Sequence, residues 1–427
     1  MPALALRLPR APVRSGDALP NAPLPPLPLR IALLFCLLSI TVFSRFGLRV
    51  GGHPVDTSLI ALYLLLATLL WHGWTRIDPR SFLLYGSGAC AATLSLLVNG
   101  GFDTGAPSAS SLALLFAIYL PFVFAVRLPG ETKAAWQWTL GMFSHVALLC
   151  ALAGIAQFYA QFFIHEPWLF NFTSHVPWHL QGPTGYNTVI PVGELYKSNG
   201  FFLREPSHFS FLMALALVAE LQFARRPLRL AAFGMALLLT YSGTGLLALS
   251  LGLMFPLGRR TLVQLLVLSV VGFVMFGLLG DTLNLGFTLN RVNEFGSERS
   301  SAYTRYVAPM RLLTEEIAST PWAVLLGHGP GTMQRVVHGV RSFDPTWAKL
   351  LFEYGLLGFG AFVALVGQTM SRLSAPAPLR VMLFMCWLVM GGYLLSPENC
   401  TMLYVLLCGW SEASADGPLA ASRGGST

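Results

Sequence analysis

Charged residues are scarce in this chain. Only 11% of its 427 residues are Asp, Glu, Lys or Arg, whereas 54% are hydrophobic. Soluble globular domains carry about 25% charged residues, so this composition excludes an ordinary water-soluble protein. Basic residues outnumber acidic ones, 27 to 19, but they do not gather on a soluble module with stacking side chains. Nucleic-acid binding requires such a module, and a nucleic-acid partner is therefore excluded.

Cysteine is also rare, and its positions give no sign of covalent or metal chemistry. All six cysteines fall within apolar runs, and no two of them form a Cys-x-x-Cys pair. A disulfide framework or a zinc site would need paired cysteines at characteristic spacings. We therefore interpret the cysteines as small core residues.

Long apolar runs are abundant, and the mean hydropathy is +0.62. Because backbone that faces lipid must hydrogen-bond internally, runs near the ~20 residues of a membrane helix predict helices. The sequence predicts an all-α polytopic membrane protein with about 12 transmembrane helices and two large periplasmic loops. The two spans expected within residues 228–257 also fit a single bent span. The expected spans are 31–49, 57–74, 81–98, 110–126, 136–160, 206–224, 228–241, 244–257, 261–280, 350–370, 380–396 and 399–410.

The two long polar loops, residues 161–205 and 281–349, lie on the same side of this predicted bundle. Lys and Arg are absent from the short turns 51–56 and 99–109 on that side and recur in the gaps on the other side. Lys and Arg accumulate in the short loops on the cytoplasmic side of a membrane, whereas long loops are largely exempt from this positive-inside rule. Both long loops are therefore predicted to face the periplasm or cell exterior.

The chain ends differ in composition from the apolar middle. Residues 1–29 are rich in proline and arginine, and residues 411–427 are small and polar. We expect the first segment to be a disordered cytoplasmic tail and the second a cytoplasmic tail. Between them, residues 30–410 form one predicted transmembrane domain that includes both long loops.

The first loop is rich in aromatic residues and closes on a charged motif. The rings suit either stacking on the C–H faces of sugars or placement at the membrane interface. Pro206 is predicted to start the following helix, which puts Arg204, Glu205 and His208 together at its outer mouth. The alternative is an Arg204–Glu205 surface pair with His208 facing a neighbouring helix.

The second loop carries several arginines. Residues 301–319 have apolar residues at helical spacing, which predicts an amphipathic helix on the membrane surface with Arg305 near the edge of its polar face. Arginine grips phosphate with two parallel hydrogen bonds, although any one arginine also fits a solvated face. The candidate substrate-binding residues are Arg204, His208, Arg291, Arg299, Arg305 and Arg335.

Two further segments of the second loop stand out. Gly327–Met333 is rich in turn residues but lacks the Lys-Ser/Thr ending of a phosphate loop. His338 and Asp344 follow it, before the Glu353-Tyr354-Gly355 segment of the next span. No Asp-x-Asp motif occurs in either long loop, so neither a metal nor another cofactor is implied.

Taken in order, these motifs resemble a known superfamily. Arg-Glu-Pro-Ser-His closes the first loop, Thr240–Leu246 breaks two short spans, and Gly-His-Gly-Pro-Gly precedes Leu-Leu-Phe-Glu-Tyr-Gly-Leu-Leu-Gly. Over about residues 30–410 the chain resembles the O-antigen ligase and Wzy-type polymerase superfamily. Within it, the chain looks closest to bacterial exopolysaccharide repeat-unit polymerases, and a xanthan-type polymerase is one expectation within that branch.

The resemblance implies a glycosyltransferase of the bacterial inner membrane. It would join oligosaccharide units carried on undecaprenyl diphosphate, with one unit as donor and another as acceptor, and a chain-length regulator is a further expected partner. Two positions depart from the ligase pattern, because Asp344-Pro345 stands where ligases carry His-Asn and Ser242-Gly243 where they often carry Ser-Arg. A catalytic histidine would have to be His338 or His208.

Transfer from a diphosphate requires stabilisation of the departing charge and removal of a proton from the acceptor hydroxyl. Our sequence-based hypothesis is that Arg204, Arg299 and Arg305 bind the diphosphate. In it, Glu205, His338 or Asp344 acts as the catalytic group that orients or deprotonates the hydroxyl. A single displacement would invert the anomeric carbon.

Two alternatives stay open at this point. One is a ligase that transfers finished glycan to lipid A core. The other is a transporter, because the Ser242–Gly245 break and the ionisable residues His72, His145 and Glu220 within spans are features that transporters use.

Overall fold

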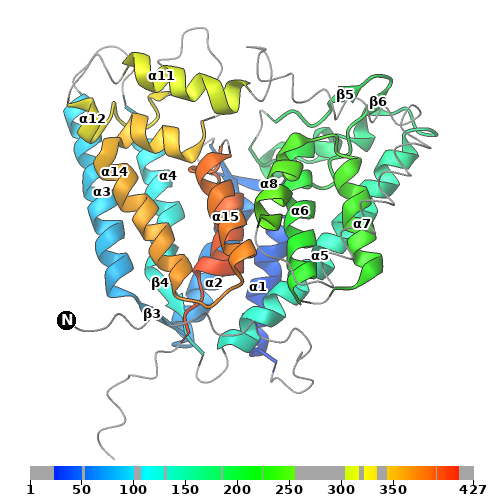
Figure 1. The fold of residues 1–427 in the computed structure, drawn as a ribbon, viewed down its shortest axis with the longest axis horizontal. Helices are drawn as coiled ribbons and strands as arrows, with labels where there is room; N and C mark the ends of the chain where they lie inside the picture. The colour runs from blue at the N-terminus through cyan, green and yellow to red at the C-terminus, as the bar shows by residue number, and fades with distance from the viewer. Residues whose placement is uncertain are drawn as a thin grey trace, which may run out of the picture.

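Helices dominate the protein (Figure 1). The computed structural model describes residues 24–50, 53–100, 107–128, 132–183, 186–223, 225–254, 303–316, 322–333, 344–390 and 392–412. The α-helices there are α1 Leu27–Ser39, α2 Thr57–Trp71, α3 Pro79–Asn99, α4 Ala109–Tyr119, α5 Thr132–Ala160, α6 Pro206–Phe223, α7 Pro227–Leu238, α8 Gly243–Leu253, α11 Ala308–Glu316, α12 Ala323–Leu326, α14 Thr346–Ser371, α15 Ala377–Val389 and α16 Pro397–Leu403.

Strands in the described residues form short antiparallel hairpins. These are β1 Gly47–Val50 with β2 His53–Asp56, β3 Thr75–Ile77 with β4 Phe124–Val126, and β5 Pro191–Val192 with β6 Leu195–Tyr196. The end of the molecule that carries α11, α12, β5 and β6, at the top of Figure 1, is called the loop end below. Strands β3 and β4 lie at the opposite end, where Arg372 bonds Asp78 at 3.1 Å.

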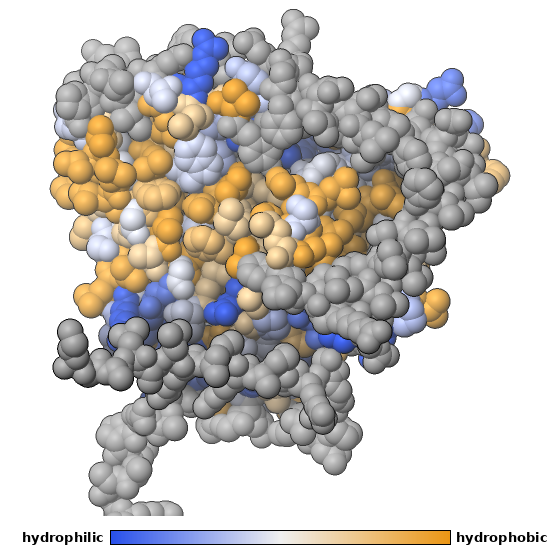
Figure 2. Space-filling model, in the orientation of Figure 1, coloured by the Kyte–Doolittle hydropathy of each residue, from blue (hydrophilic) through white to orange (hydrophobic). Residues whose placement is uncertain are grey.

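Four helices, α3, α5, α6 and α14, are long and apolar enough to cross a membrane by length and composition. Several shorter apolar helices accompany them, including α1, α2, α7, α8 and α15. Figure 2 shows hydrophobic residues across the middle of one face and hydrophilic ones toward its two ends. A helical membrane protein is therefore confirmed as the class. The total of 12 spans stays a prediction, and the span expected at 261–280 lies outside the described residues.

Local sequence explains where the helices begin. Asp56, Asp78, Ser108 and Ser396 precede α2, α3, α4 and α16, and each side chain accepts a hydrogen bond from a backbone amide of the first turn. Such caps satisfy amides that have no partner within the helix. Helix α6 begins at Pro206, as its sequence predicted.

The first span differs from the sequence-based expectation. The span expected at 31–49 is shorter, because α1 begins at Leu27 and ends at Ser39. The Ser39 and Thr41 hydroxyls donate to the Cys36 and Leu37 carbonyls near its end, and the chain then turns into β1. The two spans expected at 228–241 and 244–257 are found as two helices, α7 and α8, and not as one bent span. The turn between them contains Tyr241, which has a φ of +48°.

Helix α6 lies at the centre of the bundle. It packs against α5, α7, α8 and α15, and nearly every side chain from Phe209 to Leu221 is buried. Its buried Glu220 accepts hydrogen bonds from the Ser144 hydroxyl and the Arg226 amide, so it has a structural partner. The six cysteines are free thiols, and all of them except Cys90 are buried in this core.

The two glycine motifs near the loop end pack directly on each other. A Cβ at Gly327 would overlap the backbone at Glu353 and Tyr354, and one at Gly355 would overlap the backbone at Leu325 and Leu326. Both glycines have positive φ values, +72° and +63°. Gly355 interrupts α14, and the freed carbonyls of Phe352 and Glu353 accept hydrogen bonds from the His328 and Gly329 amides at 2.8 and 3.0 Å.

Substituting Gly355→Ala tests this contact. We expect a loss of at least about 1–2 kcal/mol of stability, the cost of left-handed backbone for a residue with a Cβ, with steric overlap adding to it. Gly360→Ala is the matched control on the same helix, because a Cβ there meets no atom within 4 Å. Thermal unfolding of the purified protein in detergent would measure both. Equal unfolding temperatures for the two variants would contradict the proposed contact.

Candidate functional site

A buried group of charged side chains lies where the first long loop enters α6. We call Arg45, Asp56, Arg204, Glu205, His208, Arg305 and Glu398 the Arg204 cluster. The Arg204 guanidinium pairs with the Asp56 carboxylate and with Glu398 at 3.3 Å, and it donates to the Ser44 carbonyl at 2.6 Å. Burial alone would lower the pKa of Arg204, but the Glu398 and Asp56 carboxylates outweigh burial and raise it above the ordinary value. Arg204 therefore carries a fixed positive charge.

Arg45 fixes the end of the loop that carries Arg204. Its guanidinium donates to the Leu203 carbonyl at 2.6 and 2.9 Å and to the Phe170 carbonyl at 3.0 Å. It also lies 4.8 Å from the ring centroid of Phe172. Burial, and then the neighbouring Arg204, lower the pKa of Arg45 to about 10. The first loop is thus anchored on the turn that follows α1.

The first loop is also held by amides buried beneath it. The Gln157 side chain donates to Asn199 Oδ1 at 2.9 Å and to the Leu169 carbonyl at 2.8 Å, and the Asn199 side chain donates to the carbonyls of Phe170 and Thr188. Some of the loop's aromatic rings pack on each other, as Phe172 and Phe201 do with centroids 5.1 Å apart. Trp178 is 66% exposed, so it lies open to solvent or lipid.

Two acidic residues complete the pairing of Arg204. Asp56 also caps α2, since Oδ1 accepts from the Ser58 amide and hydroxyl at 2.9 and 2.7 Å. Glu398 stands at the start of α16 and is buried. Burial raises the pKa of Glu398 to about 8, although Arg204 acts in the opposite direction. Below that pH the Glu398 carboxyl group is mostly neutral, and the cluster has an excess of guanidinium charge.

Glu205 and His208 lie beside Arg204 at the start of α6. The half-buried Glu205 accepts hydrogen bonds from the Asn187 amide at 3.0 Å and the Ser207 hydroxyl at 2.9 Å. His208 is edge-on to the Tyr186 ring, 5.9 Å between centroids, and lies within electrostatic reach of Glu205, Arg204 and Arg305. The predicted grouping of Arg204, Glu205 and His208 is therefore found in the structure.

Arg305 brings the second long loop to the same place. It lies in a π-helical turn, Tyr303–Val307, that leads into α11. Its Nη1 donates to the Thr244 hydroxyl at 2.8 Å, in the first turn of α8 just after the Ser242-Gly243 break. A helix is found over the described part of the predicted 301–319 segment, and Leu313 of its predicted apolar face is buried in a cluster with Phe352. Met310, which was predicted on the same face, is exposed, and the position of the helix on the membrane surface stays a prediction.

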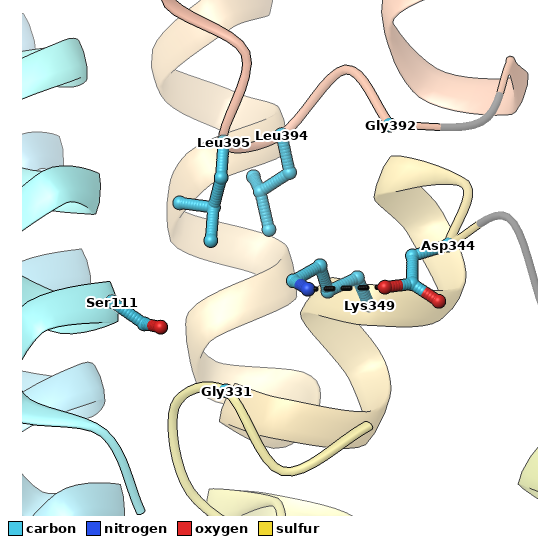
Figure 3. Close-up of a pocket in the computed structure, with 7 residues that line it drawn as sticks. All are labelled: Ser111, Gly331, Asp344, Lys349, Gly392, Leu394 and Leu395. Carbon is cyan, nitrogen blue, oxygen red and sulfur yellow. Dashed lines mark hydrogen bonds and ion pairs between the residues drawn. The ribbon is translucent and has the colours of Figure 1, made fainter. Parts of the chain in front are cut away.

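Asp344 occupies a second, separate place at the N-terminus of α14. Its carboxylate pairs with Lys349 Nζ at 3.2 Å, and the same ammonium lies 3.4 Å from Glu353. Asp344 and Lys349 line a cavity of about 330 Å³ together with Ser111 of α4, Gly331 and the segment before α16 (Figure 3). The structure thus separates Asp344 from the Arg204 cluster.

The remaining predicted site residues, Arg291, Arg299, Arg335 and His338, lie outside the described residues. Among the residues that are described, no three His, Cys, Asp or Glu side chains come together in a way that could hold a metal ion.

Comparison with known families identifies the chain. The WcaD colanic acid polymerase family matches residues 33–409. The chain belongs to this family. It is therefore a glycosyltransferase-type polymerase that builds polysaccharide from lipid-linked oligosaccharide units in a membrane. No curated protein and no solved structure matches the chain.

Our sequence analysis of this WcaD-family polymerase missed Asp56, Glu398 and Lys349. Asp56 ends a short turn immediately before an apolar run, and Glu398 is the one charged residue between two predicted spans. An isolated ionisable residue beside a membrane span is costly unless it has a partner. That signal is present in the sequence and points to both residues, although it does not identify Arg204 as their partner.

The raised pKa of Glu398 predicts a pH dependence of the polymerase's stability. The folded protein holds a proton that the unfolded chain releases between the ordinary value of 4.5 and about 8. Stability should therefore fall as pH rises through this window. In Glu398→Gln this fall should be reduced, because the amide does not titrate. Unfolding temperatures measured in detergent from about pH 5 to about pH 9 would check this.

The control for this experiment is Glu166→Gln, an exposed carboxyl of the first loop, which should keep the wild-type pH profile. An unchanged pH dependence in Glu398→Gln would show that another group is responsible.

Proposed function

We propose that this protein polymerises oligosaccharide repeat units carried on undecaprenyl diphosphate into an exopolysaccharide. The reaction is an inverting glycosyl transfer on the periplasmic side of the bacterial inner membrane, with both chain ends in the cytoplasm. Membership of the WcaD family supports polymerisation of lipid-linked units. The narrower expectation of a xanthan-type polymerase stays a prediction, as does a chain-length regulator as partner.

The convergence of the two long loops at the mouth of α6 carries this proposal. Arg204 comes from the end of the first loop, His208 from the first turn of α6, and Arg305 from the second loop. The residues lie about a hundred positions apart in the chain, so only the fold brings them together. A surface that collects guanidinium groups from two loops suits a diphosphate, whose oxygens accept paired hydrogen bonds from arginine.

The arginines have different parts in the proposed mechanism. Arg204 is held by Asp56, Glu398 and a carbonyl, so it acts mainly as a fixed positive charge that positions its neighbours. Arg305 is held to the Thr244 hydroxyl and is partly exposed, and we assign it the direct contact with the diphosphate. Arg291, Arg299 and Arg335 keep their predicted place in the same binding set.

The transfer itself needs a proton acceptor. The bond between the donor's anomeric carbon and the phosphate oxygen breaks, the acceptor oxygen bonds to that carbon, and the acceptor proton passes to a base. Of the predicted bases, Glu205 lies within the Arg204 cluster and Asp344 in the cavity beside Lys349. Glu205 is placed to accept the proton of a hydroxyl bound at the cluster. Asp344 is placed to accept the proton of a hydroxyl bound in the cavity. His338 stays a third candidate.

Incubation of the purified protein with its lipid-linked repeat unit tests the reaction class. A ladder of products that differ by one repeat unit is the expected result. A single addition to lipid A core would indicate a ligase, and vesicle uptake without any covalent change would indicate a transporter. Glu220, one of the ionisable residues that suggested a transporter, accepts a hydrogen bond from the Ser144 hydroxyl and so has a structural partner.

Arg305→Ala should lower the rate of polymer formation by about 10²–10³-fold, the usual cost of losing one group that stabilises developing negative charge. Arg305→Lys should retain more activity than Arg305→Ala, because a single ammonium keeps the charge but loses the paired hydrogen bonds. Arg311→Ala, an exposed position on α11, is the control and should retain wild-type activity. Product ladders at matched protein levels would measure the rates. Wild-type activity in Arg305→Ala would remove Arg305 from the site.

A further inference from the structure

The cavity beside Lys349 differs in chemistry from the Arg204 cluster. It has a volume of about 330 Å³, and its walls come from α4, the turn at Gly331, the N-terminal part of α14 and the segment between α15 and α16. Figure 3 shows Ser111 on one side and the Asp344–Lys349 pair on the other, with the Leu394 and Leu395 side chains pointing between them. The segment that supplies both leucines continues into Glu398, so the cavity and the Arg204 cluster are neighbours along this segment.

The charge around Lys349 disfavours an anionic occupant. One ammonium faces two carboxylates, Asp344 at 3.2 Å and Glu353 at 3.4 Å, and all three side chains are at most 6% exposed. With both carboxyl groups ionised, the formal charge of this group is negative. A phosphate or diphosphate bound here would lie beside an excess of carboxylate in a poorly hydrated place, where repulsion between like charges is strong. This arrangement disfavours the diphosphate end of the substrate in this cavity.

The lining does suit an uncharged sugar ring. The Ser111 hydroxyl, the Asp344 carboxylate and the Lys349 ammonium offer hydrogen-bond donors and acceptors to ring hydroxyls. Leu394 and Leu395 add an apolar wall for the C–H face of the ring. The volume lies at the lower end of the ~300–1,000 Å³ range of small-molecule sites, which limits the occupant to a short piece of glycan.

We infer that this cavity is a saccharide subsite that binds an uncharged sugar residue of the glycan, with Asp344 and Lys349 hydrogen-bonded to its hydroxyls. This inference rests on the proposed function, because a polymerase must hold glycan beside the diphosphate site. It divides the substrate between two places, with the sugar in the negatively charged cavity and the diphosphate at the guanidinium groups of the Arg204 cluster. Lys349 is a positioning residue here, since it holds the two carboxylates together.

Binding of the sugar can be measured without the reaction. The probe is the free repeat-unit oligosaccharide, released from its lipid by mild acid, and the readout is saturation-transfer NMR on the purified full-length protein. We expect transfer from wild-type protein to one sugar residue of the probe. Leu395→Trp, which fills the cavity, should abolish this transfer and also abolish polymer formation.

Matched variants separate the cavity from the rest of the protein. Leu357→Trp makes the same change at an exposed position of α14 and should keep wild-type transfer. Ser111→Ala removes one hydroxyl from the opposite wall and should weaken transfer a few-fold even if the Leu395→Trp protein folds poorly. Unfolding temperatures of all variants would show which ones are folded.

Arg305→Ala distinguishes failure of this inference from failure of the proposed function. It should retain sugar binding while losing polymer formation, because it lies outside the cavity. Absence of transfer from wild-type protein, or full transfer from folded Leu395→Trp and Ser111→Ala proteins, would overturn the cavity as a sugar subsite. A polymer ladder in the same preparations would leave the proposed function intact.

Discussion

The buried pairing of Arg204 with Asp56 and Glu398 is the constraint on which the loop end depends. It joins the start of α2, the start of α6 and the start of α16, which lie far apart in the chain. Removing one partner from such a pair leaves an uncompensated buried charge and costs about 3–5 kcal/mol. The network therefore specifies how these three helices meet, and Arg45 extends it by holding the first loop in place.

The site that results has two compartments that differ in charge. At the mouth of α6 the guanidinium groups exceed the ionised carboxyl groups when Glu398 is neutral, whereas two carboxyl groups face one ammonium around Lys349. An uncharged sugar residue attached to a diphosphate lipid has the same division along its length. Electrostatic complementarity of this kind sets orientation more than affinity. The separation of charge would thus decide which end of a repeat unit enters which compartment, and so contribute to the direction of chain growth.

Sequence reasoning predicted what depends on local signals. The start of α6 at Pro206, the grouping of Arg204 with His208 and the helix that contains Arg305 all follow from spacing within a few turns. Sequence reasoning did not predict pairings between distant segments, since nothing near Arg204 indicates Asp56, 148 residues away. It also made the first span too long, because apolar residues continue past Ser39 while the backbone leaves the helix. Hydropathy reports burial and not backbone conformation.

The interruption of α14 at Gly355 has a consequence for how this enzyme can vary in evolution. A helix broken among apolar side chains exposes carbonyls that lipid cannot satisfy, and here the amides of His328 and Gly329 satisfy them. The turn and the broken helix are therefore one hydrogen-bonded unit made of two separate pieces of chain. Because the contact is made by backbone, either piece can change its side chains freely as long as its glycine and its backbone path are kept.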